Sequence, residues 1–200
     1  MTVTKNKWIK RGERPLLPGE ANSPNVITDS QDNPGEIRAF RGTTILAYPI
    51  GQIAKAVCEP KDRLNWVERM SEDILIKGNP EDGEWLSYEA YQLIWPISDR
   101  DYVFKQNVQT TSCEGKKRTV VNVVSIEHPE YPEKPKRVRG TLTSCSFTLN
   151  EINNNKTHIE VIVQVDPEGR LPRFLKNIIQ KGWAIKTLRA LNKYLGENKN

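Results

Sequence analysis

The feature that most constrains the fold is a series of strand-like segments, rich in β-branched and aromatic residues, that is followed by one long helical pattern. Turn-forming runs such as GNPEDG (78–83), SCEGKK (112–117) and NEINNNK (150–156) separate many of them. Such short connections favour antiparallel pairing of successive strands. The predicted strands cover residues 36–46, 72–77, 84–94, 101–110, 118–126, 138–149 and 157–166.

Two short helices are predicted between the first and second of these strands. Pro49 opens a helix whose apolar residues recur at offsets 0, 3, 4 and 7, and Pro60 is expected to end it. A second short helix is predicted from Leu64 to Met70. The recurring apolar residues of the first helix are Ile50, Ile53, Ala54 and Val57.

The last helical pattern runs from Leu171 to Leu195 and carries two apolar stripes that change direction near Gly182. A glycine in a helix costs about 1 kcal/mol relative to alanine, so Gly182 is interpreted either as a kink or hinge or as a point of close packing. The first stripe holds Leu171, Phe174, Leu175 and Ile178, and the second holds Ala184, Leu188, Leu191 and Leu195.

This order of elements predicts an α+β domain in which a curved antiparallel sheet wraps around the long C-terminal helix. We expect a partly irregular N-terminal arm with at most one edge strand over residues 1–35, because Pro, Gly, Asn and Asp are frequent there. The domain itself is expected over 36–196, with a short tail at 197–200.

Composition narrows the class of protein. The 200 residues suit one domain, and no run approaches the roughly 18 apolar residues of a membrane span. The three cysteines (Cys58, Cys113 and Cys145) are widely spaced without a CxxC pair, which argues against a zinc site or a disulfide framework and favours a cytoplasmic location. We predict no cofactor and no metal.

The charge is unevenly distributed, because seven basic residues and no acidic one lie between Arg170 and Gly196. Since the whole chain has a net charge of +5, the remainder carries 5 − 7, or −2. A basic helix can make transient contact with an anionic membrane surface, although a simply solvated helix face explains the same pattern.

Several segments, in this order, resemble the START domains, named after the steroidogenic acute regulatory protein and its lipid-transfer relatives. They are Trp66 after the helix pair, WPISDRDYV (95–103), SIEHPEYPEKPKRVRG (125–140) and VDPEGRLPRFLKN (165–177). The resemblance spans roughly 36–195. It implies the helix-grip fold, shared with Bet v 1-like proteins, and an apolar tunnel that encloses one phospholipid, fatty-acyl lipid or sterol-like molecule and is gated by the C-terminal helix.

In sterol-binding members of the family, the tunnel holds an acidic and a basic residue on adjacent strands. Glu89 matches the acid, but Gln106 stands where the arginine would be. We therefore expect the internal salt bridge to be lost, and sterol specificity does not carry over. Strand alternation and the C-terminal apolar face then give the expected ligand-binding set: Trp85, Ser87, Glu89, Tyr91, Leu93, Tyr102, Phe104, Gln106, Phe174, Leu175, Ile178 and Ile179.

Three further features receive structural interpretations. Arg100 and Asp101 are expected to fix a corner between strands through a salt bridge, and Arg139 is expected to be an exposed strand residue. The loop 127–137 contains a PxxP pattern. It is interpreted as a plain connector, a gate at the tunnel mouth or, least of all, a ligand for an SH3-like groove.

Two other functions stay open from the sequence. A helix-grip enzyme, cyclase-like or hydrolase-like, would act on a hydrophobic small molecule, but the only histidines, His128 and His158, lie in no known catalytic motif, so we predict no catalytic residues and no enzyme. Nucleic-acid binding would use the basic helix with Phe174 and Trp183, which fall on or near the apolar stripes. We therefore predict a lipid partner and no nucleic acid.

Overall fold

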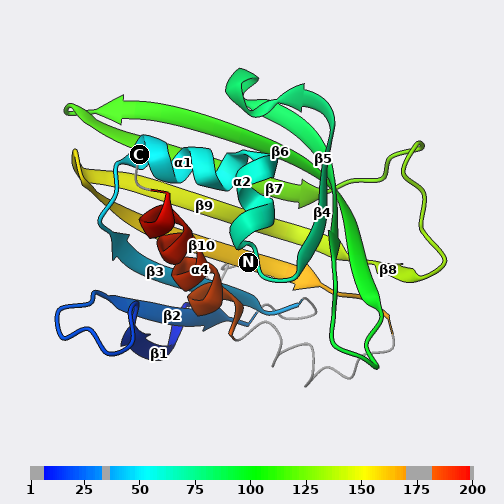
Figure 1. Ribbon diagram of the computed structural model, residues 1–200, viewed down its shortest axis with the longest axis horizontal. Coiled ribbons are helices and arrows are strands. Elements are labelled where there is room, and N and C mark those ends of the chain that lie inside the picture. The colour runs from blue at the N-terminus through cyan, green and yellow to red at the C-terminus, as the bar shows by residue number, and fades with distance from the viewer. Residues whose placement is uncertain (1–6, 33–36, 170–181, 199–200) are drawn as a thin grey trace, which may run out of the picture.

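The computed structural model describes residues 7–32, 37–169 and 182–198. Within them, one sheet runs in the order β1-β2-β3-β10-β9-β7-β6-β5-β4, and all neighbours in this order are antiparallel (Figure 1). The short β8 pairs with β6 in parallel. The strands are β1 (Ile9–Pro15), β2 (Asn25–Gln31), β3 (Ala39–Leu46), β4 (Met70–Asn79), β5 (Glu84–Tyr91), β6 (Asp99–Cys113), β7 (Lys116–Ser125), β8 (Arg137–Arg139), β9 (Thr141–Asn153) and β10 (Lys156–Asp166).

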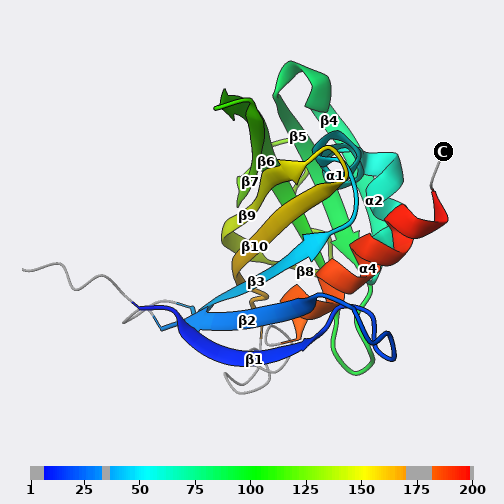
Figure 2. The ribbon, with the colours of Figure 1, turned by 90° about the vertical axis from the view of Figure 1, so that its left-hand side faces the viewer.

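The sheet curves strongly, and the helices lie together on its concave face (Figure 2). They are α1 (Ile50–Cys58), α2 (Pro60–Trp66) and α4 (Trp183–Glu197), with a 3-10 turn, η1 (Pro80–Asp82), between β4 and β5. This arrangement confirms the α+β helix-grip fold. No helix in the described part of the chain is both long and apolar enough to cross a bilayer.

The second apolar stripe of the C-terminal helix packs as predicted. Ala184, Leu188, Leu191 and Leu195 are all buried. Helix α4 lies against β3, where Gly42 makes room for it, because a Cβ at Gly42 would come within 2.8 Å of the Ala184 Cβ atom. Gly182 directly precedes α4. The part of the predicted helix before Gly182, and with it the hinge hypothesis, lies outside the described residues.

The N-terminal segment is more regular than the sequence predicted. Instead of at most one edge strand, β1 and β2 form a hairpin, and β2 pairs with β3. Leu16 and Val26 are buried in the core. These strands were not predicted because turn-forming residues are frequent in this segment and because most side chains of β1, an edge strand, are exposed. The division of the chain at residue 35 stays a prediction.

The second helix was misplaced in the prediction. Pro60 begins α2 instead of merely ending α1, since a proline at the first helical position leaves no hydrogen bond unmade. Helix α2 ends at Trp66, and Met70 already belongs to β4. This shift matters because it places Arg63 in the middle of a helix that faces the sheet.

The corner around Arg100 differs from the predicted salt bridge. Arg100 donates to the backbone carbonyls of Ser98, Pro167 and Glu168. Asp101 pairs instead with Arg139, whose Nε lies 2.9 Å from the Asp101 Oδ1. Arg139 is therefore partly buried and not a simple exposed strand residue; the buried Asp101 carboxylate accounts for the difference, because a buried charge requires a partner.

Candidate functional site

A cavity of about 470 Å³ lies between the concave face of the sheet and the helices. Its volume falls within the range of roughly 300 to 1,000 Å³ that is usual for sites binding small organic ligands. Most of the wall is apolar and comes from α1, α2 and the sheet, with Trp183 from the start of α4. The apolar wall residues include Val57, Trp66, Phe104, Val121, Val123, Leu142, Phe147, Val163 and Val165.

Six of the residues predicted to bind ligand lie in this wall: Glu89, Tyr91, Leu93, Tyr102, Phe104 and Gln106. Trp85 and Ser87 are buried near them but are not wall residues. The four predicted helix residues, Phe174, Leu175, Ile178 and Ile179, lie outside the described residues. Ligand binding by all twelve stays a prediction.

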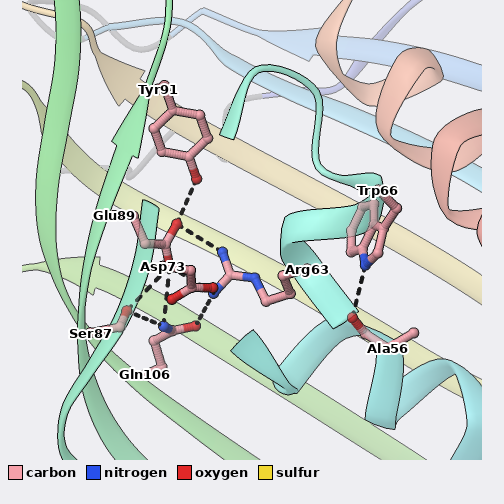
Figure 3. A network of polar contacts seen from close by, with 8 residues as sticks. All are labelled: Ala56, Arg63, Trp66, Asp73, Ser87, Glu89, Tyr91 and Gln106. Atoms are coloured by element: carbon pink, nitrogen blue, oxygen red, sulfur yellow. Dashed lines mark hydrogen bonds and ion pairs between the residues drawn. The ribbon is translucent and has the colours of Figure 1, made fainter. Parts of the chain in front are cut away.

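One end of the cavity is polar and is organised by an ion pair between α2 and β5. Arg63 donates from Nη1 to the Glu89 Oε1 at 2.6 Å and from Nη2 to the Glu89 Oε2 at 2.8 Å (Figure 3). The Glu89 side chain is fully buried, and that of Arg63 is 11% exposed. Burial opposes the charge of Arg63, but Glu89 and Asp73 raise its pKa above the ordinary value.

The expectation that Gln106 leaves Glu89 without a salt bridge is therefore wrong. Helix α2 supplies the cation in place of the neighbouring strand. The sequence signal was weak, because Arg63 directly precedes the predicted helix Leu64–Met70 and nothing local indicates what it faces. The pairing depends on how α2 packs against β4, the neighbour of β5, which is a property of the tertiary structure.

The remaining partners of Glu89 come from β5 and β6. Tyr91 donates its hydroxyl to the Glu89 Oε2 at 2.5 Å, and Ser87 donates to the Oε1 at 3.2 Å. Gln106 donates to the Ser87 Oγ at 2.7 Å and lies 3.4 Å from the Glu89 Oε1. The period-two alternation of β5 places Ser87, Glu89 and Tyr91 on one face, as predicted.

Asp73 is a second carboxylate at this end, and it was not predicted from the sequence. It lies opposite Glu89 on the neighbouring strand β4. One of its oxygens lies 3.4 Å from the Arg63 Nη1, its side chain is fully buried, and neither oxygen has a hydrogen-bond partner among the described residues. Burial raises the pKa of Asp73 to about 7; Arg63 acts against this shift and Glu89 adds to it.

Aromatic rings form the wall next to the polar end. Tyr102 stacks on Phe104 with ring centroids 5.1 Å apart and meets Tyr91 edge-on at 5.8 Å. Gly140 allows this arrangement, because a Cβ at that position would come within 2.3 Å of the Tyr102 ring. The rings therefore have fixed positions, which gives this part of the cavity a defined shape.

At another part of the wall, the cavity reaches the loop between β5 and β6. Leu93, Ile94 and Ile97 of this loop are wall residues, yet Ile94 is also 65% exposed. Trp95, next to it, is 88% exposed. The loop 127–136, by contrast, contributes no described wall residue. It packs on the opposite face, where Tyr131 stacks on Tyr88, so its predicted role as a gate at the tunnel mouth is not supported and the connector interpretation fits better.

The contacts at the polar end show which of its groups are already occupied. Glu89 is occupied by four donor residues, and neither histidine is among the described wall residues. No cluster of three or more potential metal ligands occurs in the described ranges. An apolar cavity with one polar end matches a ligand that has a long apolar body and one polar group.

Comparison with solved structures places the fold among lipid-transfer domains. Human STARD10 superposes with a TM-score of 0.81 at 17% identity, over 96% of this chain and 74% of that one. Human StAR-related lipid transfer protein 5 gives 0.78 at 21%, over 96% and 88%. The more distant ZhuI aromatase/cyclase from a Streptomyces species gives 0.56 at 10%, over 81% and 93%.

Comparison with curated protein sequences gives no match. The family model described as the START domain, however, matches residues 1–200, which is the full length of the sequence. The fold, the cavity and this match agree with one another, and we conclude that the chain belongs to the START domain family.

Proposed function

We propose that the protein is a cytoplasmic lipid carrier that encloses one lipid molecule, a phospholipid, a fatty-acyl lipid or a sterol-like molecule, in the cavity. The observation that supports this most strongly is the largely apolar cavity of about 470 Å³ with a buried Arg63–Glu89 ion pair in its wall. A sixteen-carbon chain gains about 12 kcal/mol on leaving water, at about 0.8 kcal/mol per methylene. A carrier must therefore offer a dry wall comparable to the bilayer interior, and the wall residues can supply it.

The test is native mass spectrometry of the purified protein after incubation with a lipid extract, followed by identification of the bound species. Val123 and Val124 provide a matched pair on β7, because Val123 is a wall residue and Val124 is 39% exposed on the other face. We expect one lipid per wild-type molecule, the same for Val124→Trp, and much less for Val123→Trp. Equal occupancy in the two folded variants would contradict the proposal.

Lipid exchange requires contact with a membrane, and two surfaces near the cavity support such contact. Trp183, Lys186 and Thr187 at the start of α4 are wall residues, which agrees with gating and membrane contact through the C-terminal helix. The exposed Ile94 and Trp95 are the second surface. Tryptophan is enriched at membrane interfaces, so this loop is suited to enter the headgroup layer beside the cavity.

A helix-grip enzyme is the alternative, and the similarity to an aromatase/cyclase is the observation that favours it. It would require a wall residue free to move a proton. Glu89 is fully engaged by its donors, and Asp73, whose pKa burial raises to about 7, is not a wall residue. The same mass spectra separate the two functions. A carrier returns the bound molecule unchanged, whereas an enzyme changes its mass over time.

A further inference from the structure

The polar end of the cavity contains more acidic than basic groups. Arg63 is its one guanidinium among the described residues, and it faces two carboxylates, Glu89 and Asp73. Both carboxylate side chains are fully buried. When both are ionised the cluster carries a formal charge of −1, and buried charges interact much more strongly than charges in water.

The hydrogen bonds show which groups can still bind a ligand. Glu89 receives donors from Arg63, Ser87, Tyr91 and Gln106, which exhausts the roughly four lone-pair sites of a carboxylate. Arg63 uses three N–H donors, two toward Glu89 and one toward Gln106, of the roughly five that a guanidinium has. This end of the cavity therefore retains N–H donors for an oxygen acceptor, but its cation, Arg63, is already shared by two anions. The other basic wall residues have partners elsewhere: Arg69 and Lys186 pair with Glu68, and Arg100 donates to backbone carbonyls.

From this we infer that Asp73 makes the cavity selective for lipids whose buried head is an uncharged oxygen acceptor, such as a hydroxyl, ester or amide, and excludes carboxylate and phosphate heads. The inference rests on the proposed lipid-carrier function and names the class of ligand. Asp73 is not a wall residue, so it acts through the charge it places behind Arg63. A third anion at this end would have to share the same guanidinium.

The protonation of Asp73 supports the assignment and adds a pH dependence. The titratable groups facing it are Arg63 from α2 and Glu89 and Tyr91 from β5. Because burial raises the pKa of Asp73 to about 7, its negative charge is present above that pH and lost below it. Exclusion of anionic heads should accordingly be strongest in alkaline solution and fade as the pH falls.

The experiment compares hexadecan-1-ol, hexadecanamide and hexadecanoate, which share one chain and differ in the head, by measuring the Kd of each for the full chain. At about pH 8 we expect the alcohol and the amide to bind roughly tenfold or more tighter than the carboxylate. Asp73→Asn should reduce this ratio severalfold while leaving the alcohol and the amide nearly unchanged. The control is Glu84→Gln, which removes one negative charge from a surface ion pair with Lys105 in which the Glu84 side chain is 59% exposed. It should not change the ratio.

Each outcome has a distinct meaning. If the carboxylate binds as tightly as the neutral ligands, the selectivity is wrong, while the carrier function stands. If the ratio survives in Asp73→Asn, Asp73 is not its source. If none of the three binds, the proposed function fails together with the inference. If Asp73→Asn does not fold, the ratio of the Kd values is compared in the wild type at about pH 6 and at about pH 8. A ratio that does not change with pH overturns the role of Asp73.

Discussion

At the scale of single residues, the molecule depends on a charge cluster that spans two layers. Arg63 joins α2 to β5 through Glu89 and lies near Asp73 on β4. Arg63→Met should therefore leave two buried carboxylates without a cation and cost about 3–5 kcal/mol of unfolding free energy. Urea unfolding measures this loss. Lys105→Met breaks an exposed pair with Glu84 and should cost less than about 1 kcal/mol; equal losses in the two variants would show that the buried pair has no special role.

Asp73 predicts a dependence of stability on pH. Its pKa is raised to about 7 in the folded protein, from an ordinary value of 3.8, mainly by burial. The folded state then binds the proton more tightly than the unfolded state, so this contribution is fully present below the unfolded pKa and is lost as the pH rises through about 7. Between acidic and mildly alkaline pH, the unfolding free energy of the wild type should fall by about 2–4 kcal/mol more than that of Asp73→Asn. Urea unfolding of both proteins across this range measures the difference, and parallel profiles would contradict the shift.

The same two residues show where sequence reasoning ends. Glu89 could be placed on the inner face because it matches the acidic residue of the START domains, and strand alternation then placed Ser87 and Tyr91 beside it. Asp73 could not, because β4 is an edge strand with register shifts after Met70 and after Leu75, and both Ile74 and Leu75 are exposed. Without a consistent inner face, the sequence gives no sign that one carboxylate of this strand is buried.

At the scale of elements, the contact of α4 with β3 depends on a missing side chain. A Cβ at Gly42 would lie 2.8 Å from the Ala184 Cβ atom and 3.2 Å from the Leu188 Cδ1 atom. Gly42→Ala should push α4 away from the sheet and cost about 1–3 kcal/mol in urea unfolding. Gly51, in α1, has no atom within 4 Å of such a Cβ, and Gly51→Ala should instead stabilise the protein by about 0.5–1 kcal/mol. If Gly42→Ala leaves the unfolding free energy unchanged, α4 does not pack closely on β3 at this position.

Element types were easier to predict than element contacts. Strands β3 to β7, β9 and β10 and the buried stripe of α4 follow from local periodicity, which the chain expresses strongly. The short β8 was merged with β9 in the predicted strand 138–149. The hairpin of β1 and β2 was missed because edge strands need little apolar alternation. The pairing of Asp101 with Arg139 in place of Arg100 was missed because it joins β6 to β8, a parallel contact across a long loop.

At the scale of the whole molecule, the cavity and the exposed loop between β5 and β6 are continuous with each other. The cavity wall continues into Leu93, Ile94 and Ile97, and the same loop presents Trp95 to solvent. A lipid leaving the cavity along this wall would therefore meet a bilayer without crossing water, provided that the loop enters the headgroup layer. On the proposed function, binding and delivery are separated: the cavity wall would hold the lipid, and the loop would govern its exchange.

This separation predicts that Trp95→Ser slows lipid transfer between vesicles of phosphatidylcholine and phosphatidylserine without lowering the amount of lipid bound. Burying one large apolar side chain is worth about 1.5–3 kcal/mol, so transfer should fall roughly tenfold or more. Ile152→Ser removes an exposed apolar side chain near the turn between β9 and β10 and serves as the control, with transfer unchanged. A fluorescence transfer assay gives the rates, and native mass spectrometry gives the bound fraction. Equal slowing in both variants would assign exchange to general surface hydrophobicity, and unchanged transfer in Trp95→Ser would move the membrane contact to α4.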